Sequence, residues 1–536
     1  MVRTTAFQAV NRGSIPRSAT SFMEKKEYIK IGNATDIADP KDRRIYRALE
    51  ILPGILSWGT LAGVVFLSWA SPIGAAFFII AFDIYWFLKT LFLSMHLRSS
   101  FSIIRKMLKK NWLEELKKDN GRHNLPWEEI YHLIILPMYK EGYEVAAGTF
   151  DSLLGANYPK DKMIVVLAIE ERGGKPAAGA AKKIADKYGD KFYKFLVTVH
   201  PVGIADELPG KGSNETWAGR RVKEEIIDKI SLAYVNILVS VFDIDTAVYP
   251  EYFARLTYVF LNSADRIYCS FQPVPVFNNN IWDAPSFSRV TAQSGTFWHM
   301  MQQERPERLA TFSSHAMNFK TLVEMDFWST KNVSEDSRIF WQALLFYDGR
   351  YRVAPLYYPV SMDANLAENW WQTAINVYKQ QRRWGWGAEN IPYVLFGFWQ
   401  NKNILLKTKF FWAFNHLEGF WSWGTNALII FMLGWLPLFL GGQKFNVTLL
   451  SYNLPQITRV IMTMAMVGLA TSAIYGAMIL PERPLKYSPR RYFFMILQWI
   501  LVPATIIIFG SLPGLEAQTR LMLGKYMGFW ATPKRR

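Results

Sequence analysis

Two long apolar stretches near the start of the chain constrain its fold most strongly. Residues 51–70 and 73–95 each approach the roughly 20 residues that a helix needs to cross a bilayer, and Ser71-Pro72 lies between them. We therefore expect a transmembrane helical hairpin over residues 51–95, preceded by a cytoplasmic N-terminal segment over residues 1–50. That segment contains no short apolar core with a cleavage site, so we expect no removable signal peptide.

Three further apolar stretches, at 421–440, 461–480 and 492–509, predict more spans within a membrane region over residues 416–512. Together with the hairpin, these spans would place the two ends of the chain on opposite sides of the membrane. The tail over residues 513–536 nevertheless ends in Lys534-Arg-Arg536 and is expected to be cytoplasmic. Two explanations stay open: the region 503–513 re-enters instead of crossing, or residues 410–440 contain an additional pass.

Basic residues flank the hairpin on both sides and account for much of the net charge of +17. They are Lys41, Arg43, Arg44 and Arg47 before it, and Arg98, Arg105, Lys106, Lys109 and Lys110 after it. The positive-inside rule then places both flanks in the cytoplasm of a multi-pass plasma-membrane protein. We therefore expect these basic residues to interact with the lipid bilayer. The sequence contains no recognisable nucleic-acid-binding module, so we expect no nucleic-acid partner. The single cysteine, Cys269, excludes an intrachain disulfide.

Between the two membrane regions, residues 127–365 have the composition of a soluble α/β domain. Short apolar runs at 132–136, 163–169, 195–199 and 235–242 alternate with helical patterns. Such alternation predicts a largely parallel sheet covered by helices, with ligands bound beyond the carboxyl ends of the strands. The tryptophan-rich stretch over residues 366–415 predicts amphipathic helices at the membrane interface.

Two aspartates follow the most strand-like segment of this domain. Asp243 and Asp245 are two residues apart, so both carboxylates can turn toward one hard cation. An oxygen-rich site of this kind suits Mg²⁺ or Mn²⁺ completed by waters and diphosphate oxygens. The alternative is a solvated turn at the end of a strand.

Two other segments contain residues suited to ligand binding or catalysis, but each also has a simpler structural explanation. Pro209-Gly-Lys-Gly-Ser-Asn214 has glycines that permit close backbone approach and a lysine, Lys211, that can meet phosphate charge, although an ordinary flexible loop would look the same. In Ser334-Glu-Asp336 the aspartate can act as a general base. A helix start, with Ser334 as the N-cap, would explain the same residue types.

A fourth motif lies on a predicted amphipathic helix, in Gln380-Gln-Arg-Arg-Trp384. Gln380, Arg383 and Trp384 share one face of that helix at offsets of three and four residues. An arginine fork beside a large aromatic ring provides both a diphosphate clamp and a platform for a sugar ring. The alternative is a basic stripe that faces solvent or lipid headgroups.

In this order, the motifs resemble those of the membrane-embedded processive glycosyltransferases of family 2, which include cellulose, chitin and hyaluronan synthases. Pro137-Met-Tyr-Lys-Glu141 is similar to the family's first-strand motif, Lys211-Gly-Ser-Asn214 to its nucleotide loop, and Asp243-Ile-Asp245 to its metal motif. Ser334-Glu-Asp336 is similar to its base motif and Gln380-Gln-Arg-Arg-Trp384 to the motif of synthases that retain their polymer. Two departures are that Glu170 or Glu171 stands where the family has a nucleoside-binding Asp, and that Phe312-Ser-Ser-His315 lacks its Cys-Gly.

The resemblance implies a cytoplasmic Rossmann-like domain of the GT-A type between transmembrane helix clusters, with Asp336 as catalytic base and Asp243 and Asp245 holding Mg²⁺ or Mn²⁺. It implies acceptor-binding roles for Glu335, Gln380 and Trp384. It implies nucleotide-binding roles for Pro137, Tyr139, Glu141, Glu170, Lys211, Arg382 and Arg383.

The function implied is an inverting hexosyltransferase that moves sugar from a nucleotide-diphosphate sugar to a growing polysaccharide, coupled to export and open to accessory subunits. Asp83, near the middle of the second span, would face a polar interior or form an interhelical hydrogen bond. Two alternatives remain. One is a non-processive transferase that acts on a polyprenyl phosphate, and the other is a transporter or channel with a cytoplasmic regulatory domain.

Overall fold

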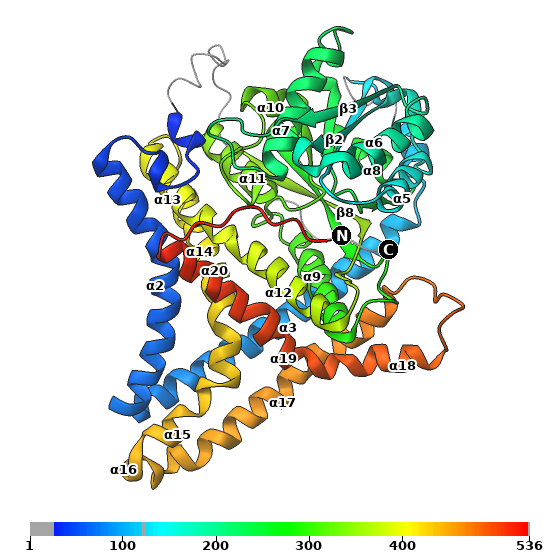
Figure 1. Cartoon of the computed structure of the whole chain (residues 1–536). Coiled ribbons are helices and arrows are strands. Elements are labelled where there is room, and N and C mark those ends of the chain that lie inside the picture. The colour runs from blue at the N-terminus through cyan, green and yellow to red at the C-terminus, as the bar shows by residue number, and fades with distance from the viewer. Residues whose placement is uncertain (1–25, 120–124, 534–536) are drawn as a thin grey trace.

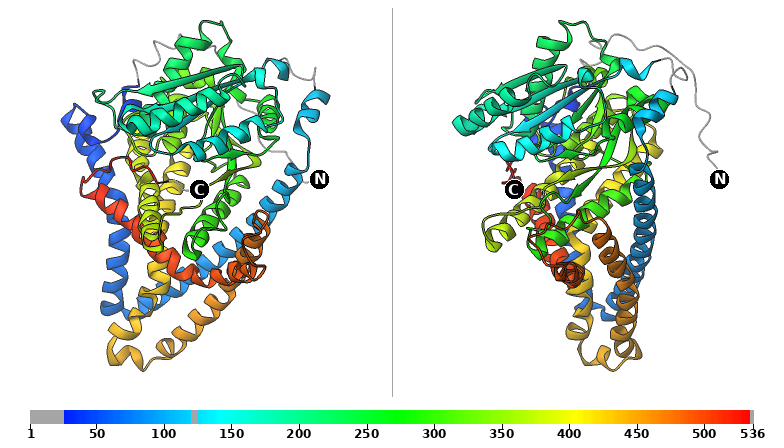
Figure 2. Two further views of the ribbon diagram at one scale, coloured as in Figure 1. Left: turned by 45° about the vertical axis from the view of Figure 1, so that its right-hand side comes forward. Right: turned by 90° about the vertical axis from the view of Figure 1, so that its right-hand side faces the viewer.

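The computed structural model describes residues 26–119 and 125–533 and consists of an α/β domain above a group of long apolar helices (Figure 1). Residues 1–25 of the expected N-terminal segment and the basic tail residues 534–536 lie outside the described chain. Figure 2 shows the same two-part arrangement from two other sides.

The α/β domain contains one mixed sheet of eight strands in the order β3-β2-β1-β4-β7-β6-β8-β5. The strands are β1 (Tyr131–Met138), β2 (Met163–Glu170), β3 (Lys194–His200), β4 (Ile237–Val241), β5 (Ala247–Val248), β6 (Cys269–Phe277), β7 (Ala316–Asn318) and β8 (Arg352–Met362). The four apolar runs predicted as strands correspond to β1 to β4, and these pair in parallel.

The expectation of a largely parallel sheet holds for β1 to β4, and the other half of the sheet is mixed. β7 lies antiparallel between β4 and β6, β8 is parallel to β6, and β5 is antiparallel to β8. These strands lack a clear sequence signal for a physical reason. β5 and β7 are very short, and prolines interrupt β6 and β8, where they remove backbone donors.

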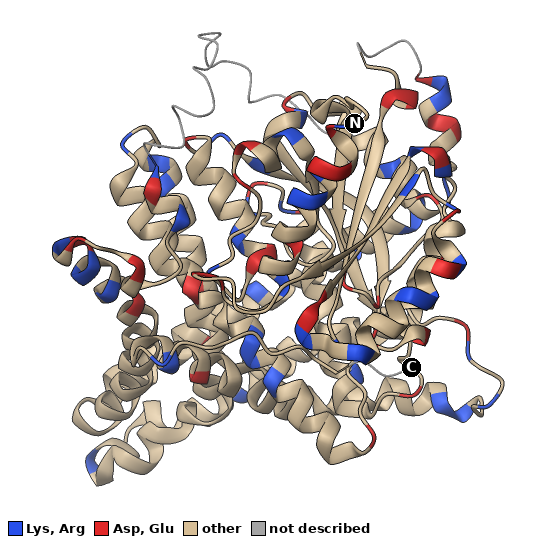
Figure 3. Cartoon of the chain, turned by 45° about the horizontal axis from the view of Figure 1, so that its top comes forward, with Lys and Arg blue, Asp and Glu red and all other residues tan. Residues whose placement is uncertain are grey.

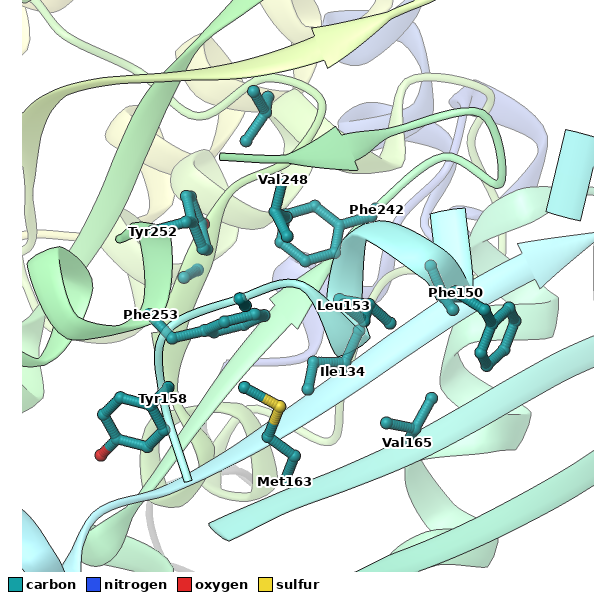
Figure 4. Close-up of a cluster of buried hydrophobic side chains, with 14 of the residues drawn as sticks. Ile134, Phe150, Leu153, Tyr158, Met163, Val165, Phe242, Val248, Tyr252 and Phe253 are labelled. Atoms are coloured by element: carbon teal, nitrogen blue, oxygen red, sulfur yellow. The ribbon is translucent and has the colours of Figure 1, made fainter. Parts of the chain in front are cut away.

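Helices cover both faces of the sheet and bury two apolar clusters. In β1, Ile134 and Leu136 face one cluster, formed with α5 (Tyr143–Leu154), α6 (Gly174–Tyr188) and α8 (Tyr252–Asn262) (Figure 4). Leu133 and Ile135 face the other, formed with α7 (Lys211–Val222), α10 (Phe319–Glu324), α11 (Glu335–Phe346) and α13 (Asn390–Gln400). Burial on both faces explains why the strands read as continuous apolar runs.

Two further helices connect the sheet to the helices below it. They are α9 (Ser286–Gln303), which packs on β6, and α12 (Trp370–Gly385), which packs on α20. Within the segment expected at the membrane interface, α12 exposes Trp370 and Trp371. α13 instead buries Tyr393 and Phe398 in the α/β core, because its apolar residues surround the whole helix and do not form one stripe.

Four helices are long and apolar enough to cross a membrane, and a bent pair is a further candidate within the described chain. The four runs are α2 (Pro40–Ala70), α3 (Pro72–Leu108), α17 (Leu449–Met478) and the run from α18 to α20 (Arg490–Met522). The pair is α14 (Leu406–Phe431) with Leu433–Leu440, bent by 49°, which contains α15 (Leu436–Leu440). Charged side chains are sparse along these helices (Figure 3), and many large apolar side chains on them are exposed.

The run from α18 (Arg490–Leu497) through α19 (Val502–Ile506) to α20 (Leu512–Met522) differs from the other four. α2 and α14–α15 lead away from the α/β domain and α3 and α17 return to it, meeting near α16 (Gly442–Asn446) at the far end (Figures 1 and 2). The run instead has both ends beside the α/β domain: Arg491 donates to the Trp282 carbonyl at 3.1 Å, and Glu516 pairs with Arg382 of α12 at 2.7 Å.

Its middle also stays close to the domain. Gln498 accepts a hydrogen bond from Arg289 of α9 at 2.6 Å, and Trp499 stacks on Phe297 of α9 with ring centroids 5.5 Å apart. The stretch 492–509, expected as a fifth span, therefore begins and ends on the same side of the helices.

Candidate active site

Asp243 and Asp245 follow β4, but they have different surroundings. Asp243 is partly exposed, and its Oδ2 accepts a hydrogen bond from Ser313 at 3.0 Å. Asp245 is fully buried, and its Oδ2 accepts a hydrogen bond from the Asp363 backbone N–H at 3.1 Å. Asn279 supports this second aspartate by donating to its carbonyl and to the Asp363 carboxylate, each at 2.9 Å. Asp243 is therefore the accessible one of the two, while Asp245 is fixed against the end of β8.

Lys211, the first residue of α7, joins three of the sequence motifs. Its Nζ lies 2.9 Å from Asp243 Oδ1, 3.3 Å from Glu335 Oε1 and 3.5 Å from Glu215 Oε1. The close approach of α7 to α11 depends on Gly212, because a Cβ there would lie 2.8 Å from the Ser329 carbonyl oxygen and 3.0 Å from the Glu335 Cβ. The nucleotide loop, the metal motif and the base motif thus meet at one amino group.

Asp336 lies in the first turn of α11, as the sequence predicts, but the helix start is built differently. Ser334 occupies the N-cap position without a side-chain capping hydrogen bond. The carboxylate of Glu389 instead accepts from the backbone N–H groups of Val333 and Ser334 at 3.0 and 2.9 Å. The serine hydroxyl therefore does not cap the helix, and a carboxylate from the segment after α12 holds the two N–H groups just before its first residue, Glu335.

Burial and crowding shift the protonation of this cluster. Burial opposes the charged form of Lys211, but the carboxylates of Asp243, Glu215 and Glu335 outweigh it and raise the lysine pKa well above its ordinary value. Burial raises the pKa of Glu335 to about 7, although Lys211 acts in the opposite direction. Burial also raises the pKa of Asp336, while Lys211 and then Arg383 favour its charged form.

The two arginines of α12 point to different places. Arg382 forms an ion pair with Glu516 of α20 at 2.7 Å, so the structure does not bring it to the carboxylates. Arg383 lies close enough to Glu335 and Asp336 to influence both, and its guanidinium sits 5.2 Å from the Phe529 ring centroid. One turn of helix therefore uses one arginine to attach α20 and places the other near Glu335 and Asp336.

Trp384 packs against the cluster at the end of β6 and β8. Its ring centroid lies 6.0 Å from that of Phe277, and it packs against a cluster that contains Met362, the neighbour of Asp363. The ring is half-buried, so one face rests on the protein. Gln380, one turn earlier on α12, is also half-buried.

The loop after β1 meets the end of β2 on the side expected to bind the nucleoside. Glu141 accepts from the Tyr139 and Lys140 backbone N–H groups at 2.8 and 3.0 Å, which gives it a role in shaping the loop. Glu170 is buried and bonded to Arg172, whose guanidinium lies 4.5 Å from the Tyr139 ring centroid. Pro137 lies within β1, paired with Ala168 of β2.

Glu171, the second carboxylate that the sequence left open, lies elsewhere. It is exposed and accepts a hydrogen bond from the Val202 backbone N–H at 2.9 Å. Of the two glutamates, Glu170 is therefore the one placed beside the aromatic ring of Tyr139.

The donor chemistry fits a divalent cation held together with a ligand. The carboxyl groups of Glu215, Asp243, Glu335 and Asp336 all act on the single amino group of Lys211, while burial raises the pKa of Glu215 well above its ordinary value and favours its neutral form. Among the residues the structure describes, no three His, Cys, Asp or Glu side chains form a complete metal cage. Mg²⁺ and similar ions typically use one or two carboxylates plus substrate phosphates, and Asp243 and Asp245 provide that number.

Three residues of this site are absent from the sequence prediction. Glu215 follows Lys211 by one helical turn, which is a spacing that could have indicated it. Asp363 follows β8, a strand without a recognisable pattern, and Glu389 acts through contacts with a segment distant in sequence. The last two carry no local signal, because their roles depend on tertiary contacts.

The sequence matches no protein-family model and no curated protein. Among solved structures, the fold is similar to the mannosyltransferase PcManGT from Pyrobaculum calidifontis in complex with GDP-Man and Mn²⁺, at 14% identity and a TM-score of 0.40 over 84% of this chain and 100% of that one. It is also similar to S. aureus TarS 1–349 (11% identity, TM-score 0.33) and to the same fragment with UDP-GlcNAc (12%, 0.34), in each case over 74% of this chain and 93% of the other. These neighbours are glycosyltransferases. Because the scores are low, the functional proposal rests on the residues of the site.

Proposed function

We propose that this chain is an inverting membrane glycosyltransferase that transfers sugar from a nucleotide-diphosphate sugar to a growing polysaccharide. The observation that carries the proposal is the meeting of Asp243 and Glu335 at the amino group of Lys211, with Asp336 and Arg383 beside them. Such a cluster combines a cationic place for a diphosphate with a carboxylate base, which is what sugar transfer requires.

The donor occupies the cleft between Lys211 and the loop after β1. Tyr139 and Glu170 contact the nucleoside, while Lys211 and Arg383 neutralise the diphosphate as charge develops on it. Asp243 and Asp245 would hold Mg²⁺ or Mn²⁺, which supplies further charge stabilisation to the leaving diphosphate. Arg382 forms an ion pair with Glu516 of α20, so its role is to position the helix and not to bind the diphosphate.

Asp336 removes the proton from an acceptor hydroxyl as that oxygen bonds to the anomeric carbon and the bond to the diphosphate breaks. Its position at the start of α11 holds it beside Arg383 and Lys211, which keep a fraction of its carboxyl charged despite burial. Glu335, with its pKa near 7, can hydrogen-bond to the acceptor in either protonation state.

A prediction for Trp384 separates a polymer synthase from a single-sugar transferase. We expect Trp384→Ala to keep nucleotide-sugar affinity but to shorten the product, since the change removes a sugar platform worth about 0.5 to 1.5 kcal/mol beyond area burial. Trp384→Phe, which keeps an aromatic face, should restore much of the length. Product length is measured by gel filtration, beside the melting temperature. Unchanged length with lowered stability would leave Trp384 as a packing residue against Phe277.

Membrane placement follows from the helices. We propose that α2, α3, α14–α15 and α17 cross the bilayer, that α18–α20 lies at its cytoplasmic face, and that the α/β domain is cytoplasmic. Asp83 of α3 is buried and shares a side-chain hydrogen bond with Thr458 of α17, which fits the interhelical role. The polymer would leave between these helices.

Thiol labelling in cells tests this topology. Lys182→Cys, exposed on α6, should resist an impermeant reagent in intact cells and react after lysis, whereas Lys444→Cys, exposed on α16 at the far end, should react without lysis. Labelling of the native Cys269 should be low, because this cysteine is buried and the pKa of its thiol is raised to about 11. Labelling of Lys182→Cys in intact cells would reverse the orientation.

The activity itself is tested by incubating the purified protein in lipid with a panel of nucleotide sugars and Mn²⁺. Polymer formation supports the proposal, and a lipid-linked monosaccharide would support the single-sugar alternative. Absence of nucleotide release with every donor would reject both and favour a transporter or channel.

A further inference from the structure

A pocket lies between the C-terminal half of α3 and the C-terminal end of α17, away from the carboxylate cluster. It has a volume of about 440 Å³. Four of its lining residues are cations and two of its walls are aromatic: Arg98, Arg105, Lys106, Lys109, Phe101 and Tyr475. No part of the proposed transfer reaction uses this pocket.

The cations of the pocket lack carboxylate partners in the described part of the chain. Within residues 26–119 and 125–533, none of the four forms an ion pair with a carboxylate, whereas Lys89, deeper in α3, pairs with Glu418 at 2.5 Å. Like charges gathered on one helix repel each other, so an anion in the pocket would relieve the repulsion. The pocket therefore favours an anionic ligand.

The remaining walls favour an apolar attachment to that anion. Ile474 and Met478 of α17 also line the pocket, and their side chains are 60% and 49% exposed. The rings of Phe101 and Tyr475 close it on the inner side, with centroids 4.8 Å apart. This apolar surface continues along the exposed faces of α3 and α17, so a ligand with an anionic head and a long apolar tail matches both parts.

The position of the pocket agrees with such a ligand. Around it, α3 and α17 pack with Val290 and Phe297 of α9, at the end of the apolar helices that adjoins the α/β domain. In the proposed membrane placement, on which this inference rests, that is the level of the cytoplasmic headgroups. Basic pockets between transmembrane helices on this side bind anionic lipid headgroups.

We propose that this pocket binds the phosphate headgroup of an anionic membrane phospholipid, with an acyl chain lying against α17. A soluble phosphate shares the headgroup chemistry but would leave the apolar wall unused. The pocket thus binds one lipid molecule in a defined position, beyond the diffuse attraction of basic flanks to a charged surface.

The test measures phosphatidylglycerol retained by the full chain after extraction from nanodiscs of phosphatidylcholine and phosphatidylglycerol, by native mass spectrometry. Arg105→Ala/Lys106→Ala should lose about 25-fold in retention, or about fivefold per cation. Lys41→Ala/Arg44→Ala, a pair of exposed cations on the other flank, is the matched control and should retain the lipid. Ser102→Trp fills the pocket with its charges intact and should also displace the lipid.

Equal retention in the pocket and control variants would overturn the proposal, as would full retention in Ser102→Trp. Displacement of the bound lipid by millimolar glycerol phosphate would assign the pocket to a soluble phosphate. That result would also reject the proposal of a lipid site. The readout requires no sugar transfer, so its failure is distinguishable from failure of the proposed enzymatic function.

Discussion

Asp336→Asn is expected to lower sugar transfer by about 10² to 10⁴ while nucleotide-sugar binding stays close to that of the wild type. Asparagine keeps the size of the side chain but cannot take the proton from the acceptor hydroxyl. Lys211 makes its short contacts with Asp243, Glu215 and Glu335, so the place for the diphosphate should survive the change. Initial rates of nucleotide release and calorimetric binding of the donor measure the two quantities separately.

The control for this change is Asp326→Asn, the same substitution at a half-exposed residue outside the site, which pairs with Arg220 at 3.0 Å and with Lys30 at 3.8 Å. Its backbone φ of 60° is one that asparagine adopts readily, so neither activity nor stability should change appreciably. Loss of a helix N-terminal charge costs only about 0.3 to 1 kcal/mol of stability. Wild-type turnover in Asp336→Asn, or a loss of activity explained by unfolding, would return Asp336 to a role at the helix start.

Asp245→Asn should remove metal-dependent turnover, with a loss of about 10³-fold if the cation contributes several kcal/mol to transition-state stabilisation. The fold should persist, because the amide oxygen of asparagine can still accept the hydrogen bond from the Asp363 N–H. Donor binding is measured with Mn²⁺ and with a chelator. The wild type should bind more tightly with Mn²⁺, whereas the variant should show the same affinity in both conditions.

This comparison separates two roles of a fully buried carboxylate. If Asp245→Asn retains the stimulation by Mn²⁺, the aspartate serves only to fix the end of β8 through Asp363. If the variant loses donor binding even with the chelator, the substitution has disturbed the cleft, and the melting temperature will show the same damage. Only the selective loss of the Mn²⁺ effect supports the metal assignment.

The sequence determined those features that depend on neighbouring residues. Burial on both faces makes β1 to β4 continuous apolar runs, and length and composition alone identify the long apolar helices, so both are visible without tertiary information. Lys211, Asp243 and Asp336 were predicted because their types and spacing suit the chemistry, and the structure brings them together. The mixed half of the sheet was missed, because its strands are short or interrupted by proline.

Only the tertiary structure decided which partners these residues meet. Arg382 and Arg383 are adjacent and chemically identical, yet Glu516 of α20 binds the first, whereas the second lies near Asp336. Glu389, and not the Ser334 hydroxyl, satisfies the backbone at the start of α11. The run from α18 to α20 is apolar enough to cross a membrane, but contacts at both of its ends hold it beside the α/β domain. Composition and periodicity report how a segment is buried, whereas contacts between segments distant in the chain determine where it lies and what each polar side chain binds.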